Sequence, residues 1–117
     1  MTRILVVEDD PDLRPLLHHI LWDGGYEVDV ADSAAGANSL LERRAYDLIL
    51  ADARLSDGTG MTVARRAERK GARVLIITGY ALELPSGELE AYEFLLKPVR
   101  PDELLAAIGR VLNAPTN

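Results

Sequence analysis

Cysteine is absent from this sequence of 117 residues, which excludes disulfides, thiolate zinc sites and cysteine nucleophiles. No apolar run approaches the roughly 18 residues that a membrane-spanning helix needs. The first such run, Ile4 to Val7, is followed at once by acids, unlike the apolar core of a secretory signal. An excess of basic residues is also missing: the net charge is −6, whereas nucleic-acid partners favour basic surfaces. We therefore expect a cytoplasmic protein without membrane or nucleic-acid partners.

The length and composition indicate one folded domain. Hydrophobic residues make up 48% of the chain, as is typical of soluble globular proteins. A chain of this length buries well over half of its unfolded surface, so it forms a core without covalent staples. The last segment of helical periodicity ends a few residues before the end of the sequence. We therefore expect residues 1–117 to form a single domain with no second domain attached.

Short apolar runs, rich in β-branched residues, alternate with longer amphipathic segments. The runs predict strands at Ile4 to Val7, Tyr26 to Val30, Leu48 to Ala51, Val74 to Ile77 and Phe94 to Leu96. This alternation predicts an α/β fold in which a five-stranded, doubly wound parallel sheet carries helices on both faces.

The segments between these strands contain helix signals. Asp10 before Pro11 is typical of an N-cap followed by proline at the first helical position. Ser33 is expected to cap a second helix that ends near Arg44, and a third helix covers roughly Met61 to Lys70. Apolar residues at helical spacing are expected to face the core in the first helix and in the last. They are Leu13, Leu16, Leu17, Ile20 and Leu21, and Leu104, Leu105, Ile108, Val111 and Leu112.

Polar residues follow the strands at their carboxyl ends, the edge at which open parallel sheets bind ligands. Glu8, Asp9 and Asp10 follow the first strand, and Asp52 follows the third. If these strands are neighbours, the carboxylates converge, and two charges ~4 Å apart repel by about 4 kcal/mol at an effective dielectric constant of ~20. Such a group needs a raised pKa or a cation, and an all-oxygen site with few carboxylates suits Mg²⁺. Asp10 alone is better explained as an acid that complements the dipole of the following helix.

Four motifs occur in an order and spacing that resemble the receiver domains of two-component response regulators. They are ILVVEDD, the aspartate after LILA, the threonine after VLII, and LLKP, and the resemblance covers about Ile4 to Leu112. It implies a (βα)5 flavodoxin-like fold with the strand order 2-1-3-4-5 and no attached output domain. It also implies a signalling phosphoacceptor, not an enzyme, that catalyses its own phosphotransfer and slow autodephosphorylation. The phosphoryl group would come from a histidine kinase or a histidine phosphotransfer protein, and phosphorylation would switch the binding of a downstream protein.

The resemblance assigns the acidic residues to phosphoryl transfer. It implies that Asp52 is the phosphoryl acceptor and that Glu8 and Asp9 form the acidic pair that positions Mg²⁺. The backbone carbonyl of Arg54 would be a further ligand of the metal. Phosphoryl transfer to a carboxylate depends on positioning and on neutralised charge, which an acid–metal site supplies.

The resemblance also assigns residues at the ends of the fourth and fifth strands. Thr78 would be the switch hydroxyl that bonds a phosphoryl oxygen, and Lys97 the ammonium group that pairs with the acyl phosphate. The Lys97–Pro98 bond would be cis and turn the lysine inward. Phe94 would be the aromatic switch position, and it is also expected to pack in the core.

Three positions depart from the usual family pattern. Ser56 stands where proline is usual, Val99 where phenylalanine is frequent, and Arg54 is an uncommon residue beside the acceptor. None of these departures removes a catalytic group. Arg54 and Tyr80 are bulky and are expected to shield the phosphorus from an attacking water, which predicts a long-lived acyl phosphate.

The segment between Thr78 and Lys97 is short for a loop, a helix and a strand. It has 18 residues, and residues 85–87 read Pro-Ser-Gly where a helix interior would lie. Proline costs about 3 kcal/mol in a helix interior. We expect the fourth helix to be short, distorted or mobile, and residues 79–91 to switch between disorder and order. The Thr-Gly-Tyr run at residues 78–80 resembles a sub-class of single-domain receivers from alphaproteobacteria with a degenerate fourth helix.

Three other classes share parts of this pattern. Haloacid-dehalogenase-like phosphohydrolases also use a strand-end aspartate with Mg²⁺, but they need an acid where this chain has Arg54. A flavin or dinucleotide binder would use a glycine-rich loop, and residues 58–60, Gly-Thr-Gly, lack the rest of that fingerprint. A pseudo-receiver that only binds proteins would not need the full set of acids, threonine and lysine.

Overall fold

Five parallel strands form the central sheet of the computed structural model, which describes residues 1–79 and 91–114. The strands are β1 (Arg3–Val7), β2 (Glu27–Ala31), β3 (Leu48–Asp52), β6 (Arg73–Thr78) and β7 (Glu93–Leu96). Their order across the sheet is β2-β1-β3-β6-β7, which confirms the predicted order 2-1-3-4-5. The expectations for the fourth helix and for Tyr80 concern residues 80–90, which lie outside the described part of the chain.

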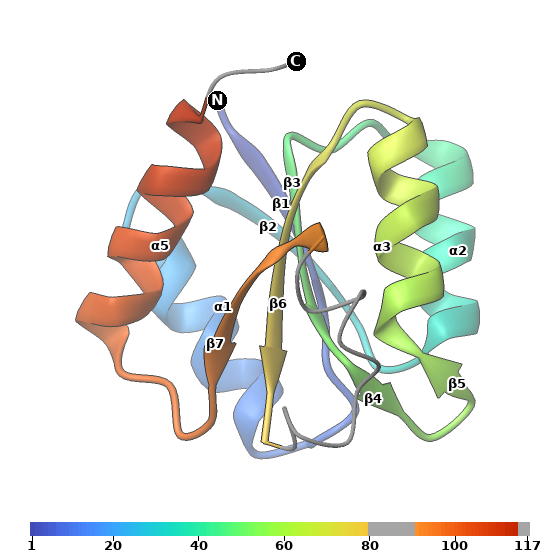
Figure 1. Cartoon of the computed structure of the whole chain (residues 1–117), viewed down its shortest axis with the longest axis horizontal. Helices are drawn as coiled ribbons and strands as arrows, with labels where there is room; N and C mark the ends of the chain where they lie inside the picture. Colours follow the sequence, from blue (N-terminus) through green and yellow to red (C-terminus); the bar gives the residue numbers. More distant parts are fainter. Residues whose placement is uncertain (80–90, 115–117) are drawn as a thin grey trace.

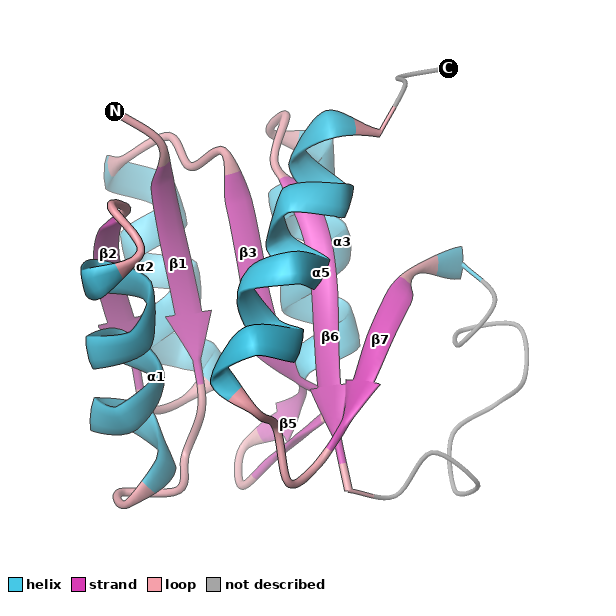
Figure 2. Cartoon of the chain, turned by 90° about the vertical axis from the view of Figure 1, so that its left-hand side faces the viewer, coloured by secondary structure: helices cyan, strands magenta, loops and turns pink. Residues whose placement is uncertain are grey.

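Helices cover both faces of this sheet, as the alternating pattern predicts. Helices α1 (Leu13–Asp23) and α5 (Pro101–Asn113) lie on one face, and α2 (Ala34–Arg43) and α3 (Gly60–Arg69) lie on the other. Figure 1 shows the two layers on either side of the strands, and Figure 2 shows α1 and α5 in front of the sheet. The fold is therefore the predicted doubly wound α/β sandwich.

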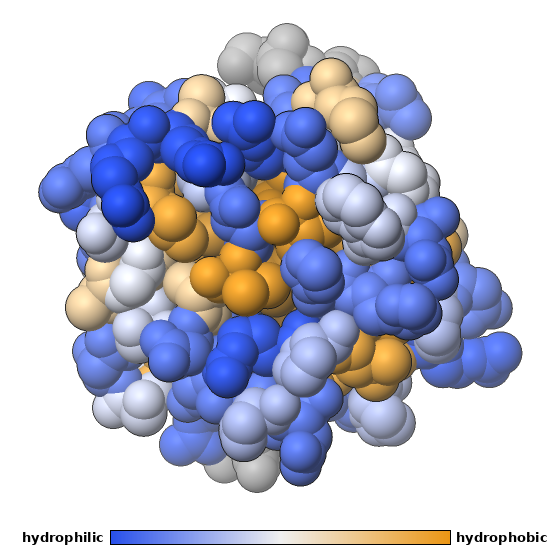
Figure 3. Space-filling model, turned by 180° about the vertical axis from the view of Figure 1, so that it is seen from behind, coloured by the Kyte–Doolittle hydropathy of each residue, from blue (hydrophilic) through white to orange (hydrophobic). Residues whose placement is uncertain are grey.

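The central strands are buried on both faces, which explains why they appear in the sequence as continuous apolar runs. In β1, Ile4 and Val6 pack against the α1 and α5 layer, whereas Leu5 and Val7 pack against the α2 and α3 layer. The surface seen from behind is mainly hydrophilic, with apolar patches near its middle (Figure 3). Within the described residues, no helix is both long and apolar enough to cross a membrane.

The start of α1 follows the predicted capping pattern in part: Asp10 accepts hydrogen bonds there, but the N-cap residue is Asp12, so Pro11 lies before the helix and not at its first position. The Oδ1 atom of Asp10 accepts hydrogen bonds from the backbone amides of Asp12 (2.8 Å) and Leu13 (3.3 Å). The backbone amide of Arg14 donates to the carbonyl of Asp10, although the regular helix begins only at Leu13. The expectation that Leu16 faces the core is wrong: the residue is 50% exposed, because it lies at the edge of the apolar stripe.

The segment after β3 contains a small hairpin that the sequence pattern does not reveal. Strands β4 (Arg54–Leu55) and β5 (Gly58–Thr59) pair antiparallel and form a separate two-stranded sheet. Gly58 has φ +149°, a conformation that favours glycine at this turn. Two residues per strand are too few for an alternating pattern, so the sequence predicts only a loop here.

Candidate functional site

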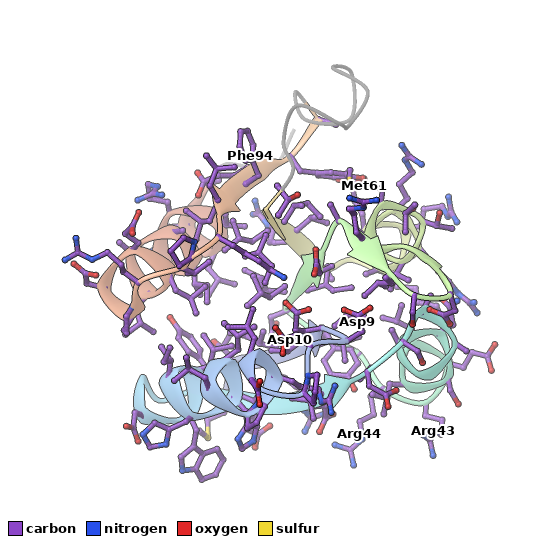
Figure 4. The ribbon with its side chains drawn as sticks, turned by 90° about the horizontal axis from the view of Figure 1, so that it is seen from below. Asp9, Asp10, Arg43, Arg44, Met61 and Phe94 are labelled. Carbon is purple, nitrogen blue, oxygen red and sulfur yellow. The ribbon has the colours of Figure 1, made fainter. Side chains whose placement is uncertain are left out.

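The three predicted metal-binding acids meet at the carboxyl edge of the sheet. Because β1 and β3 are neighbours, with Val7 paired to Ala51, the residues that follow them lie side by side. Glu8, Asp9 and Asp52 each present a carboxylate oxygen, and these oxygens lie within 4.8 Å of one another. Figure 4 looks at this edge from below and shows Asp9 near the centre of the molecule, between the two helix layers.

Lys97 closes this cluster from the end of β7. Its backbone amide donates to the carbonyl of Thr78 (2.9 Å), and the Lys97–Pro98 peptide bond is cis. Its Nζ atom lies 2.7 Å from Oδ2 of Asp52 and 2.9 Å from Oε1 of Glu8. One ammonium group thus bridges two of the three acids.

Burial sets the protonation of Glu8. This carboxyl group has no exposed surface, and burial raises its pKa to about 7, with a further upward contribution from Asp52. Lys97 acts in the opposite direction but does not cancel this effect. For Lys97 itself, burial alone would lower the pKa, but the bonds to Asp52 and Glu8 outweigh it and the pKa is raised.

The raised pKa of Glu8 predicts how the stability of the metal-free protein depends on pH. Between the ordinary value of 4.5 and about 7, the folded protein keeps a proton that the unfolded chain has lost. Stability should therefore fall as pH rises through this window, by on the order of 3 kcal/mol in all. The raised pKa of Lys97 contributes stability that is lost only above its ordinary value of 10.5, outside this window.

The test is denaturant unfolding from pH 5 to pH 8 in the presence of a metal chelator. Glu8→Gln carries no titrating proton, so its stability should change much less across this range than that of the unmodified protein. Equal slopes for the two proteins would show that Glu8 does not hold this proton.

The acceptor candidate Asp52 is held at both carboxylate oxygens. Oδ1 accepts a hydrogen bond from the backbone amide of Arg54 (3.1 Å), and Oδ2 accepts one from Lys97. Its side chain is almost fully buried. These two contacts hold the carboxylate of Asp52 in one position.

The loop after β1 is held by contacts from two other segments. Oδ2 of Asp9 accepts a hydrogen bond from the backbone amide of Ser56 (3.0 Å). Nη1 of Arg14 donates to the carbonyl of Glu8 (3.1 Å). Asp10 faces the start of α1 instead, and the amides of Asp12 and Leu13 lower its pKa. Asp10 therefore stabilises the start of α1, as the sequence analysis predicts for this acid.

Gly60 is a site residue that sequence reasoning missed. Its amide donates to the carbonyl of Ala53 (3.1 Å), and a Cβ atom at this position would lie 1.8 Å from the backbone oxygen of Asp52. Only glycine therefore allows α3 to begin this close to the backbone of Asp52. In the sequence, Gly60 reads as a loop marker, and no local signal shows what it approaches.

The remaining candidates lie at different depths. Thr78 is fully buried at the end of β6, beside the bond that fixes Lys97. Phe94 is 36% exposed and belongs to neither core cluster, so the expectation that it packs in the core is wrong. Phe94 lies on β7, which is the edge strand next to β6. Helix α3 packs against β6. The side chain of Phe94 points away from the centre of the molecule in Figure 4. Arg54 is exposed, and Tyr80 lies outside the described residues.

The residues present suit a hard divalent cation. All the side-chain donors of the acidic cluster are carboxylate oxygens, and the cluster already needs positive charge. Oε1 of Glu8 is buried without a hydrogen-bond partner of good geometry within the described part of the chain, although Lys97 supplies charge nearby. Because the ammonium group of Lys97 lies 2.9 Å from this oxygen, a metal ion or one of its bound waters would share the oxygen with Lys97.

A doubly wound parallel sheet with three acids and a lysine at its carboxyl edge defines a class of flavodoxin-like α/β domains. Within this class, residues 4–109 match the family model of the response regulator receiver domain. This chain belongs to that family, whose members are the phosphoacceptor signalling domains of two-component systems.

Known relatives and solved structures agree with this family. The chain is 35% identical over 115 residues to the alginate biosynthesis transcriptional regulatory protein AlgB of Pseudomonas putida, covering 94% of the chain and 26% of AlgB. It is 33% identical over 123 residues to the acid tolerance regulatory protein ActR of Rhizobium meliloti, covering 97% of the chain and 63% of ActR. The chain thus spans about a quarter of AlgB and less than two thirds of ActR.

Two solved structures are also similar across nearly the whole chain. A CheY-like receiver domain from Methanospirillum hungatei has a TM-score of 0.84 and 30% identity, with 97% of this chain and 94% of that chain covered. The response regulator TrrA of Thermotoga maritima, solved in complex with Mg²⁺ and BeF, has a TM-score of 0.84 and 31% identity. That comparison covers 95% of this chain and 99% of TrrA.

Proposed function

We propose that this domain takes a phosphoryl group from the phosphohistidine of a histidine kinase or a histidine phosphotransfer protein onto Asp52. The observation that carries the proposal is the position of Lys97 Nζ, 2.7 Å from Asp52 and 2.9 Å from Glu8, inside a cluster of three acids. A carboxylate held between a lysine and a cation site is a nucleophile prepared for phosphoryl transfer.

In the proposed reaction, a carboxylate oxygen of Asp52 forms a bond to phosphorus. The bond between phosphorus and the imidazole nitrogen of the donor breaks, and its electron pair stays on the imidazole. Hydrolysis later adds water to the acyl phosphate, releases inorganic phosphate and restores the carboxylate. Lys97 would balance negative charge on the phosphoryl oxygens throughout.

Glu8, Asp9, Asp52 and the backbone carbonyl of Arg54 would hold Mg²⁺. When bound, this ion would neutralise charge on the phosphoryl oxygens and on the crowded carboxylates. The solved complex of TrrA with Mg²⁺ and BeF supports this choice of cation for a relative of the same fold. The oxygen-only donor set of the present chain supports it independently.

The response to phosphorylation would begin at Thr78, which is buried at the end of β6 next to Lys97. Its hydroxyl would bond a phosphoryl oxygen, and Phe94 on β7 would change its exposure in turn. Arg54 and Tyr80 would lengthen the life of the acyl phosphate. The readout would be altered binding of a downstream protein, and relatives such as AlgB are named as transcriptional regulators.

The direct test is incubation of the purified protein with Mg²⁺ and a small acyl phosphate donor, followed by intact-mass measurement. The proposal expects one phosphoryl group per chain, dependent on Mg²⁺. The adduct should be lost in alkali, as acyl phosphates are. No adduct under these conditions, or an adduct that is stable to alkali, would contradict the proposal.

Removing one of the converging charges should have opposite effects on the empty and the loaded site. Asp9→Asn keeps an oxygen for the bond from Ser56 but relieves repulsion, so the metal-free protein should gain up to about 1 kcal/mol, given that Asp9 is partly exposed. The same change removes a proposed ligand and should weaken Mg²⁺ binding by at least about tenfold.

Thermal unfolding and calorimetric titration with Mg²⁺ measure these two effects. The unmodified protein should gain about 1.4 kcal/mol at a Mg²⁺ concentration ten times Kd. Asp12→Asn is the matched control, because Asp12 is an exposed acid at the start of α1 and lies outside the cluster. If the control and Asp9→Asn lose the same Mg²⁺ affinity, Asp9 is not a ligand.

A further inference from the structure

The hairpin that carries Arg54 is held in place from outside by a side chain with no assigned role. Strands β4 and β5 have two residues each, and a two-stranded hairpin of this size is not stable alone. At its tip, the carboxylate of Asp57 accepts two hydrogen bonds from the start of α2. Oδ1 takes the amide of Ala34 (2.9 Å) and Oδ2 takes the amide of Ala35 (3.1 Å).

This contact joins two segments that are distant in sequence. Helix α2 has no acidic residue in its own first turn, and the side chain of Ser33 accepts the amide of Gly36, not those of Ala34 and Ala35. Asp57 supplies the missing acceptors, because amides in the first turn have no partners inside the helix. The tip of the hairpin is thereby fastened to a helix that is itself packed on β1 and β2.

A second hydrogen bond holds the tip of the hairpin, but its acceptor is also a proposed ligand of the cation. The amide of Ser56 donates to Oδ2 of Asp9, which is one of the three acids of the cluster. If Asp9 turns its carboxylate to a cation, this tie weakens. Both carboxylate oxygens of Asp57 accept from amides of α2, and Asp57 is not one of the three acids of the cluster, so a cation bound there does not compete with these bonds.

We propose that Asp57 is a positioning residue for the cation site. By fastening the hairpin to α2, Asp57 would hold the backbone carbonyl of Arg54 in place for Mg²⁺ and the Ser56 amide in place for Asp9. Asp57 touches neither the metal nor the phosphoryl group. The inference rests on the proposed function, because it needs the magnesium site that the function requires.

The test compares two variants that each remove hydrogen bonds from the first turn of α2. Asp57→Ala frees the hairpin, whereas Ser33→Ala leaves it tied and serves as the control. Both should lower the melting temperature in the presence of a metal chelator. Calorimetric titration with Mg²⁺ alone should give a Kd raised by about tenfold for Asp57→Ala, the range typical of groups that orient metal ligands. Ser33→Ala should leave the Kd unchanged.

A second variant separates position from charge. Asp57→Asn removes the charge but keeps one carbonyl oxygen for the start of α2, so its Kd for Mg²⁺ should lie much nearer to that of the unmodified protein. The effect of Asp57→Ala should also persist at about 1 M ionic strength, where charges are screened beyond ~3 Å. Saturating Mg²⁺ should restore the phosphorylation rate of Asp57→Ala, because the acceptor itself is intact.

Each outcome is informative. An unchanged Kd for Asp57→Ala, an equal loss in Ser33→Ala, or an equal loss in Asp57→Asn would overturn the positioning role while leaving the proposed function standing. Failure of the unmodified protein to bind Mg²⁺ would overturn the proposed function and this inference together. If Asp57→Ala does not fold, Ala34→Pro removes one of the two bonds from the α2 side, at a first helical position where proline is accepted, and an unchanged Kd in that variant would overturn the positioning role.

Discussion

Asp52→Asn should abolish phosphoryl incorporation while leaving the fold intact. The carboxamide has almost the same shape as the carboxylate and keeps an oxygen for the amide of Arg54, but it is not a nucleophile. Lys97 retains Glu8 as a partner, so the variant leaves no buried ammonium unpaired. The expected result is no detectable adduct by intact mass after incubation with Mg²⁺ and an acyl phosphate donor, at a donor concentration that modifies the unmodified protein fully.

The control for this variant is Asp10→Asn, which changes the neighbouring acid. Asparagine caps helices as well as aspartate does, and the Oδ1 bonds to Asp12 and Leu13 can be kept. Most of the incorporation should therefore remain. Equal labelling of Asp52→Asn and of the unmodified protein would place the phosphoryl group elsewhere. Loss of labelling in Asp10→Asn would instead bring that residue into the site.

Asp52→Asn also tests the electrostatic description of Glu8. The charge of Asp52 is one cause of the raised pKa of Glu8, after burial. Removing it should lower that pKa, so the fall in stability, which begins near the ordinary value of 4.5, should end at a lower pH and be smaller in the variant. This outcome depends only on geometry and charge, and can be checked without any phosphoryl donor.

The centre of the sheet could be predicted because its strands β1, β3 and β6 are buried on both faces. Runs such as Leu48 to Leu50 are fully buried, and their continuous apolar character separates them from the amphipathic helices. The convergence of Glu8, Asp9 and Asp52 could not be predicted from the apolar pattern of the sequence alone. It required the order of the strands, which came from the family resemblance, since apolar periodicity alone does not say which strands are neighbours.

The parts that the sequence did not predict depend on contacts between distant segments. Asp57 followed by Gly58 reads as a turn, but the partners of Asp57, at Ala34 and Ala35, are 23 and 22 residues away. Leu16 was misplaced because spacing defines a helical stripe but not which of its margins the sheet covers. Phe94 was misplaced because its apolar strand was expected to be buried like the central strands, although the implied order 2-1-3-4-5 puts that strand at the edge of the sheet, where it is mostly exposed.

Gly60 makes the tightest contact of this kind, with the backbone of Asp52. Gly60→Ala should therefore destabilise the fold and displace the candidate site. The added Cβ atom would lie 1.8 Å from the backbone oxygen and 2.8 Å from the backbone carbon of Asp52. Because both of these atoms are backbone, no flexible side chain can move aside. Either α3 or the end of β3 must shift. Overpacking of this kind costs about 3 kcal/mol, which lowers the melting temperature of a domain of this size by on the order of 10 °C.

The matched control is Gly109→Ala in α5, where the added Cβ atom meets nothing within 4 Å. Alanine is favoured over glycine in helices, so this variant should be more stable than the unmodified protein, by up to about 1 kcal/mol. Its phosphorylation should not change. Thermal unfolding of the two variants separates the steric effect at Gly60 from the general effect of replacing glycine.

Gly60→Ala should also slow phosphorylation at temperatures where it remains folded. A displacement of about 1 Å in a reacting group can cost on the order of a hundredfold in rate, and the shift must occur at Asp52 itself or at the helix that follows it. Because the carboxylate is still present, adduct should form slowly and reach completion with more donor, in contrast to Asp52→Asn. Normal rates and a normal melting temperature would show that α3 can move away freely, and that glycine at this position does not set the place of the acceptor.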